Sequence, residues 1–179
     1  MKPPQPPPTL ATHKAPTGIS GFDAIAGGGL PRGRTTLLVG GPGSGKTVFA
    51  LQFLVHGVQH CKEPGIFVAL EETSQCILAN ADSFGWNITP AQRKKLFFLD
   101  AQPQSDLIQS GDFDLCGMLA GLEAQALATG ARRIVFDALD ILLALLPDAA
   151  AQRREIYRLH AWLLSRELTA IITLKADTD

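Results

Sequence analysis

The sequence predicts an α/β fold in which a mainly parallel β-sheet carries helices on both faces. Two observations lead to this prediction. Short apolar segments of strand length alternate along the chain with longer segments of helical periodicity, which is typical of parallel strands joined by right-handed crossovers. Several strand segments are also apolar on both faces, as buried parallel strands are. The expected strands are residues 35–39, 65–70, 96–99, 133–136 and 169–174.

Four helices are expected between these strands. The first spans residues 48–59, and the second follows Thr73, a residue type that caps helix N-termini. The third lies within residues 115–130, where apolar positions share one face. Asp148 is suited to cap the fourth, and the residues of that helix expected to face the core are Ile156, Leu159 and Leu163.

The first residues of the chain have a different composition from the rest. Residues 1–16 contain six of the twelve prolines and show no hydrophobic periodicity. We expect a disordered, partly polyproline II tail there. The remaining residues, 17–179, are enough for one domain with a sizeable core.

Composition and charge exclude several classes of protein. The formal net charge is −1, which gives no general attraction to nucleic acid or to an anionic membrane. No apolar run approaches the length of a membrane span, and the N-terminus shows no secretory signal. Cys61, Cys76 and Cys116 are far apart and odd in number, so we expect small buried hydrophobes in a reducing compartment. A cytoplasmic protein is the expectation.

The segment with the most information is residues 40–47, which fits the phosphate-binding pattern G-x-x-x-x-G-K-[ST]. An apolar strand, which we expect to be buried, precedes it and an apolar helix follows it, which is the context that this loop requires. Its backbone N–H groups would converge on phosphate oxygens, its lysine would reach the β- and γ-phosphates, and its threonine hydroxyl would ligate Mg²⁺. We expect the nucleotide to be bound by Gly41, Gly43, Ser44, Gly45, Lys46, Thr47 and Val48.

Hydrolysis of a bound nucleotide would need carboxylates near the phosphates. Residues 133–136 form an apolar strand that ends at Asp137, a candidate for the Mg²⁺ site together with Thr47. Glu71 and Glu72 directly follow another apolar strand, and strand ends at this edge of a parallel sheet line the ligand crevice. We expect these glutamates to activate the attacking water, although acidic residues at a helix N-terminus are the alternative explanation.

Other polar residues carry weaker signals. Asp140 lies three residues after Asp137 and is a secondary candidate that orients the loop. His56 and His60 have the i, i+4 spacing of metal ligands, but no third ligand is evident, so a place at a helix surface or core edge is favoured. Residues 93–95 form a short basic run that is more typical of a solvated surface than of a nucleic-acid site.

Several of these segments, taken in order, resemble KaiC, the RecA-superfamily ATPase of circadian clock systems and of clock-independent bacterial and archaeal relatives. Those that carry the resemblance are residues 18–23, residues 28–34, the phosphate loop, residues 70–73 and residues 83–86. The similarity extends over residues 16–175. It implies a RecA-like P-loop NTPase fold, and ATP bound between the subunits of a ring that is usually a hexamer.

The resemblance also implies roles for single residues. Residues 43–47 would hold the phosphates, and Thr47 and Asp137 would serve Mg²⁺. Glu71 and Glu72 would be the glutamates that prepare the water, with Glu71 the first choice for the base. In KaiC, further strands follow the one that matches residues 169–174, and they carry the cations that reach the neighbour's ATP. Because this chain ends at Asp179, we do not carry over the trans-acting charge, the ring interface or the kinase activity.

Three functions remain as hypotheses. The first is slow, Mg²⁺-dependent ATP hydrolysis in a KaiC-like switch. The second is a nucleotide-binding assembly or signalling module with little or no hydrolysis, and the third is a DNA-dependent motor, which the charge disfavours. We also expect residues 169–174 to lie near a sheet edge whose unpaired backbone groups promote self-association in place of a closed hexamer.

Overall fold

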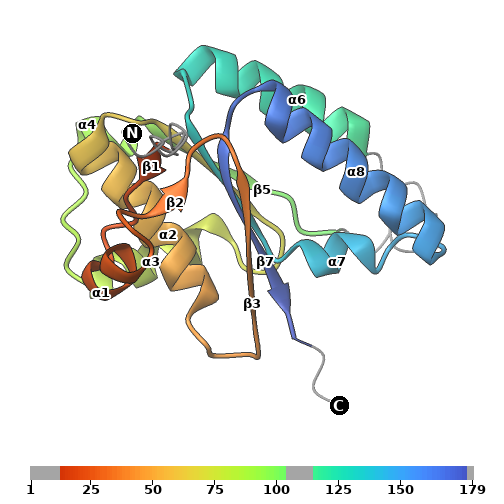
Figure 1. Cartoon of the computed structure of the whole chain (residues 1–179), viewed down its shortest axis with the longest axis horizontal. Coiled ribbons are helices and arrows are strands. Elements are labelled where there is room, and N and C mark those ends of the chain that lie inside the picture. The colour runs from red at the N-terminus through yellow and green to blue at the C-terminus, as the bar shows by residue number, and fades with distance from the viewer. Residues whose placement is uncertain (1–12, 104–114, 177–179) are drawn as a thin grey trace, which may run out of the picture.

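The computed structural model describes residues 13–103 and 115–176, and it contains a five-stranded parallel sheet (Figure 1). The strand order is β3-β7-β6-β4-β5, and each neighbouring pair is parallel. The α/β fold with a parallel sheet is therefore confirmed. The bounds of the strands are β3 (Thr35–Gly40), β4 (Gly65–Ala69), β5 (Leu96–Asp100), β6 (Arg133–Asp137) and β7 (Thr169–Lys175).

Helices cover both faces of this sheet (Figure 1). One face carries α1 (Ser20–Ile25), α2 (Lys46–His56), η1 (Gly57–Cys61), α3 (Ser74–Ser83) and α4 (Pro90–Arg93). The other carries α6 (Leu115–Thr129), α7 (Leu139–Leu143) and α8 (Ala149–Ser165). None of the helices among the described residues is long and apolar enough to cross a membrane.

The central strands divide their side chains between two cores, as the two-residue period of a strand requires. In β4, Ile66 and Val68 pack with α6, α7 and α8, while Phe67 packs with α2 and α3. The strands β6 and β7 alternate in the same way. Apolar residues at consecutive positions are therefore all buried, which is why these strands are apolar throughout.

Both predicted helix caps are present. The Thr73 side chain accepts a hydrogen bond from the Cys76 N–H at the start of α3, and the Asp148 carboxylate accepts one from the Ala151 N–H at the start of α8. The inward face of α8 is confirmed for Leu159 and Leu163, but Ile156 is exposed. Since α8 lies at the surface of the molecule, its buried stripe is narrower than the apolar pattern suggested.

The boundary of the N-terminal tail differs from the prediction. Residues 1–12 lie outside the described residues, but the last part of the expected tail is folded. Lys14–Ala15 forms strand β1, which pairs antiparallel with β2 (Leu30–Pro31), and Ala15 is fully buried. Asp23 holds the following turn, because its carboxylate accepts hydrogen bonds from Thr17 and Gly18. Burial would raise the pKa of Asp23, but these hydrogen bonds outweigh it and leave the pKa below its usual value.

Three further expectations are wrong. Cys76 and Cys116 are exposed and Cys61 is half-buried, so the cysteines are not core residues. The strand at residues 169–174 is not at an edge, because β7 pairs with β3 on one side and β6 on the other. The edge on that side of the sheet is β3 instead, which was expected to be buried but has Leu37 58% and Val39 57% exposed.

Candidate functional site

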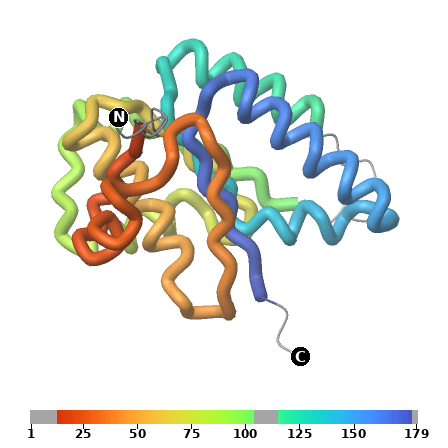
Figure 2. Tube along the Cα trace, in the orientation of Figure 1, coloured from red at the N-terminus to blue at the C-terminus, as the bar shows by residue number. Residues whose placement is uncertain are grey.

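The phosphate loop connects β3 to α2 at the carboxyl end of the sheet, and Figure 2 shows it beside the end of β7. Gly43 and Gly45 have φ angles of 74° and 84°, a left-handed conformation that glycine adopts without steric cost. The Lys46 ammonium lies inside the loop, where it donates to the carbonyls of Gly40 at 2.6 Å and Gly41 at 2.9 Å. The helix α2 begins at Lys46, so its free N–H groups open toward the loop.

A cavity of about 400 Å³ lies in front of this loop. Every nucleotide-binding residue expected from the sequence lines it except Gly41, whose carbonyl instead accepts from Lys46. Both candidate glutamates and the candidate metal ligand also line it. The remaining lining residues were not foreseen as part of the site: Pro42, Asn80, Ala138 and Lys175.

Thr47 and Asp137 meet at the floor of the cavity. The Thr47 hydroxyl donates to Oδ2 of Asp137 at 2.8 Å, although the two residues are 90 positions apart. Asp137 is only 6% exposed, and its other oxygen accepts from the Thr173 hydroxyl of β7. A hydroxyl beside a carboxylate offers the hard oxygen ligands that Mg²⁺ takes beside nucleotide phosphates, so these two side chains fit that ion.

Glu71 and Glu72 lie on the exposed turn that follows β4. Oε1 of Glu71 accepts a hydrogen bond from the Lys175 ammonium at 2.6 Å. This hydrogen bond and the charge of Glu71 raise the pKa of Lys175 above its usual value. No sequence motif pointed to Lys175 in advance, but it directly follows a predicted strand of the same sheet, and such positions line the crevice.

A neighbouring strand holds the glutamate turn from the side. At the end of β5, the Asp100 carboxylate accepts from the Ser74 N–H at 2.6 Å and from the Ser74 hydroxyl at 2.8 Å. The Gln102 amide donates to the carbonyls of Ala69 at 3.0 Å and Glu72 at 2.7 Å. The turn that carries both glutamates is therefore fixed at both of its ends by residues from β5 and the loop after it.

A family model of the KaiC ATPase matches residues 15–179, which is nearly the whole chain. The chain belongs to the KaiC family of ATPases. Its relatives agree: KaiC of Parasynechococcus marenigrum is 43% identical over 166 residues, which cover 92% of this chain and 32% of the relative. KaiC of Thermostichus vulcanus is 44% identical over 162 residues (89% and 31%), and KaiC2 of Synechocystis sp. is 38% identical over 167 residues (92% and 29%). These relatives are circadian clock proteins by name, and the chain spans about a third of their length.

The secondary candidates do not line the cavity in front of the phosphate loop. Asp140 accepts from the Lys175 backbone N–H at 3.2 Å, which ties α7 to the end of β7. The rings of His56 and His60 are 4.7 Å apart, but no group of three or more metal-ligating residues occurs within the described ranges. Arg93 lies over the Phe98 ring, so part of the basic run is used for packing.

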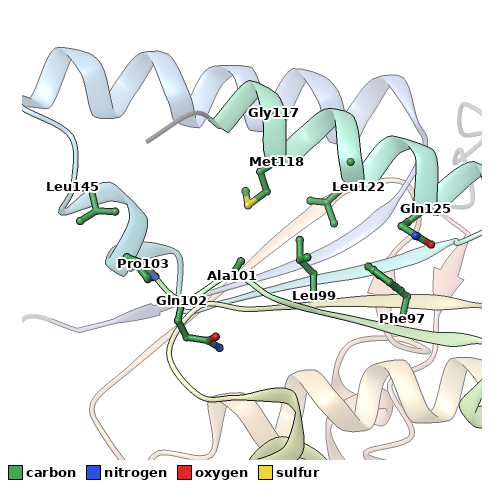
Figure 3. Close-up of a pocket in the computed structure, with 11 residues that line it drawn as sticks. Phe97, Leu99, Ala101, Gln102, Pro103, Gly117, Met118, Leu122, Gln125 and Leu145 are labelled. Atoms are coloured by element: carbon green, nitrogen blue, oxygen red, sulfur yellow. The ribbon is translucent and has the colours of Figure 1, made fainter. Parts of the chain in front are cut away.

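A second cavity of this KaiC-family chain, of about 550 Å³, has no comparable chemistry. It lies between β5 and α6, where Phe97, Leu99 and Ala101 face Met118 and Leu122 (Figure 3). None of the described residues that line it carries a charge. Of these two cavities, the one in front of the phosphate loop is lined by the candidate catalytic residues.

Proposed function

We propose that this chain binds ATP with Mg²⁺ and hydrolyses it slowly, as the nucleotide switch of a KaiC-type domain. The observation that carries this proposal is that the phosphate loop, the Thr47–Asp137 pair and the glutamate turn line one cavity. The relatives are clock proteins, but the chain spans about a third of their length. The proposal for this chain is therefore limited to its nucleotide chemistry.

Each group has a distinct task in this proposal. The N–H groups at the start of α2 and the Lys46 ammonium bind the phosphates. Thr47 and Asp137 would hold Mg²⁺, which when bound would neutralise charge on the β- and γ-phosphates. The oxygen of a water bonds to the γ-phosphorus while the bond from that phosphorus to the β–γ bridging oxygen breaks. A glutamate of the turn takes the proton that the water loses, and ADP leaves.

The second candidate is a nucleotide-binding assembly module that hydrolyses little or no ATP. One observation favours it. The cations that line the cavity among the described residues, Lys46 and Lys175, are both engaged within the chain, by loop carbonyls and by Glu71. A cation that stabilises charge in the transition state can change a phosphoryl-transfer rate by about three to five powers of ten.

Calorimetric titration with ATP and Mg²⁺ tests the binding part of the proposal. Lys46→Ala removes the charged donor while the backbone of the loop stays intact. Hydrogen bonds to charged groups contribute about 1.5–3 kcal/mol, so we expect the affinity to fall about 10- to 100-fold with the fold retained. Lys62→Ala, an exposed lysine outside this cavity, is the matched control. Equal ATP affinity in both variants would reject the site.

ATP turnover tests the hydrolytic part and separates the two candidates. Glu71→Gln combined with Glu72→Gln keeps the shape of both side chains and removes the base. We expect ATP to bind normally and turnover to fall by about two to four powers of ten. Undiminished turnover would move the catalysis elsewhere. A wild-type protein that binds ATP without hydrolysing it would identify the assembly module, and stimulation by single-stranded DNA would identify a motor.

A further inference from the structure

Lys175 joins two strands that are not neighbours in the sheet. It is the last residue of β7 and pairs in register with Gly40, the first residue of the phosphate loop. Its ammonium contacts Glu71, which follows β4, and β6 lies between these two strands. The side chain therefore crosses the end of the strand that carries Asp137.

The charges around this lysine explain why a cation is placed there. Glu71 and Glu72 are adjacent carboxylates, Asp137 lies in the same cavity, and Asp140 contacts the Lys175 backbone. Lys46 is the other cation that lines the cavity in the described part of the chain, and it donates to carbonyl oxygens. Lys175 is thus the cation placed to offset the repulsion between the two glutamates.

Stability alone is a poor reason for this ion pair. Both side chains are partly exposed, and exposed ion pairs contribute little to folding because water and salt screen them. The pair does, however, restrict where the Glu71 carboxylate lies. A carboxylate on an exposed turn has many rotamers, and a general base must lie within hydrogen-bond reach of its water.

We propose that Lys175 is a positioning residue of the nucleotide site, which holds the ionised carboxylate of Glu71 over the phosphate loop as the base for the attacking water. The inference rests on the proposed ATP hydrolysis and adds the residue that places its base. Lys175 acts through Glu71, so its removal lowers the turnover number at saturating ATP and leaves ATP affinity unchanged. Among the residues that the structure describes, Glu72 has no such ion-pair partner.

The pairing itself can be tested without nucleotide. The pKa of Lys175 is measured by NMR titration of ¹³C-lysine-labelled protein, with the signal assigned by Lys175→Arg. Since Glu71 raises this pKa, we expect a lower value in Glu71→Gln than in the wild type. Glu72→Gln is the matched control and should leave the pKa near that of the wild type. The same pKa in Glu71→Gln and the wild type would overturn the inference.

Kinetics then test the catalytic consequence. Lys175→Met keeps the length of the side chain and removes its charge, and we expect the turnover number to fall about 10- to 100-fold, the size of effect that misplacement of a catalytic group produces. Lys175→Arg should restore most of the activity. Adding Lys175→Met to Glu71→Gln should cause no further loss, whereas adding it to Glu72→Gln should.

The kinetic results separate a failure of the role of Lys175 from a failure of the proposed ATP hydrolysis. Full turnover in Lys175→Met, or a further loss of the same size in the double variant with Glu71→Gln, would overturn the role of Lys175 alone. A fall in ATP affinity with an unchanged turnover number would instead make Lys175 a phosphate-binding residue. If the wild-type protein binds ATP but never hydrolyses it, both the proposed hydrolysis and this inference fail.

Discussion

Outside the site, Arg133 is the residue that most needs charged and polar partners, because its side chain is completely buried at the start of β6. Its Nε and Nη2 atoms each lie 2.6 Å from Oε2 of Glu63, and Nη1 donates to the carbonyls of Pro16 and Phe53. Arg32 also pairs with Glu63 from the surface. A buried guanidinium requires such partners, because an unpaired charge in the interior is strongly destabilising.

Glu63→Gln should therefore destabilise the fold. The neutral amide still accepts a hydrogen bond but no longer offsets the charge of Arg133, so we expect a loss of about 1–3 kcal/mol at pH 7. Urea unfolding measures this loss. The control is Glu167→Gln, because Glu167 is exposed and its side chain has no hydrogen bond or ion pair among the described residues. Equal midpoints for Glu63→Gln and the wild type would show that Glu63 is dispensable.

The destabilisation should also depend on pH. Burial would raise the pKa of Glu63, but its hydrogen bonds with Arg133 and Arg32 outweigh this and hold the pKa below the usual 4.5. A carboxylate whose folded pKa is depressed stabilises the fold above its unfolded pKa and loses that contribution as pH falls through the folded value. The difference between wild type and Glu63→Gln should thus be constant near neutrality and shrink below about pH 4.5. A difference that grows toward low pH would contradict this assignment.

The residues of the site that could be predicted are those that belong to a short, contiguous sequence pattern. The phosphate loop is one contiguous pattern, and Asp137 and the glutamates each end an apolar strand, so the sequence alone brings them to one edge of the sheet. Lys175 and Asn80 enter the cavity through tertiary contacts. Lys175 lies 104 positions after its partner Glu71, and no local sequence pattern predicts a contact over that separation.

At the scale of elements, the strands β4 and β5 form a support for the glutamate turn. They pair in parallel along their whole length, and Asp100 and Gln102 continue this pairing beyond the strands through side-chain hydrogen bonds. The Gln102 amide is the more informative probe, because it donates to the carbonyl of Ala69, which precedes the two glutamates, and to the carbonyl of Glu72 itself. Removing it loosens the turn without changing a charge.

Gln102→Ala should lower ATP turnover about tenfold and increase amide hydrogen exchange in residues 70–74. Both effects follow from the loss of the two hydrogen bonds, each of which contributes about 0.5–1.5 kcal/mol. Gln125→Ala is the matched control, since Gln125 lines the same apolar cavity as Gln102 and its side-chain amide makes no hydrogen bond within the described part of the chain. Unchanged exchange in residues 70–74 would show that the turn does not depend on this amide.

The elements were predictable in kind but less so in detail. Helix α2 continues into the π-helical turn η1, at which a Cβ on Gly57 would lie 2.6 Å from Nε of Arg133. The glycine that allows this close approach cannot be recognised without knowing where Arg133 lies. The apolar segment at β3 was predictable as a strand. Its exposure was not, because it follows from the place of β3 at the edge of the sheet, which depends on the order of the strands.

At the scale of the whole molecule, the strand order determines which surface is left open. Within the described residues, β3 pairs with β7 on one side only. Leu37 and Val39 point to the same face and are more than half exposed, and Leu37 also lines an apolar groove of about 290 Å³ between β3, α7 and α8. An exposed, apolar edge strand offers unpaired backbone groups to another chain.

We therefore predict that the 179-residue protein self-associates through β3 and does not form a closed, ATP-dependent hexamer. Leu37→Lys combined with Val39→Lys should yield a monomer, because a charged edge strand disfavours pairing. Leu127→Lys, at a still more exposed position on α6, should leave the association unchanged. Sedimentation velocity with and without ATP makes the measurement.

A hexamer that ATP stabilises would show that ring surfaces lie within this chain, and a wild-type monomer at high concentration would show that the edge of β3 is covered. Neither result would alter the nucleotide site, because the cavity lies at the carboxyl ends of the strands and not along the free edge of β3.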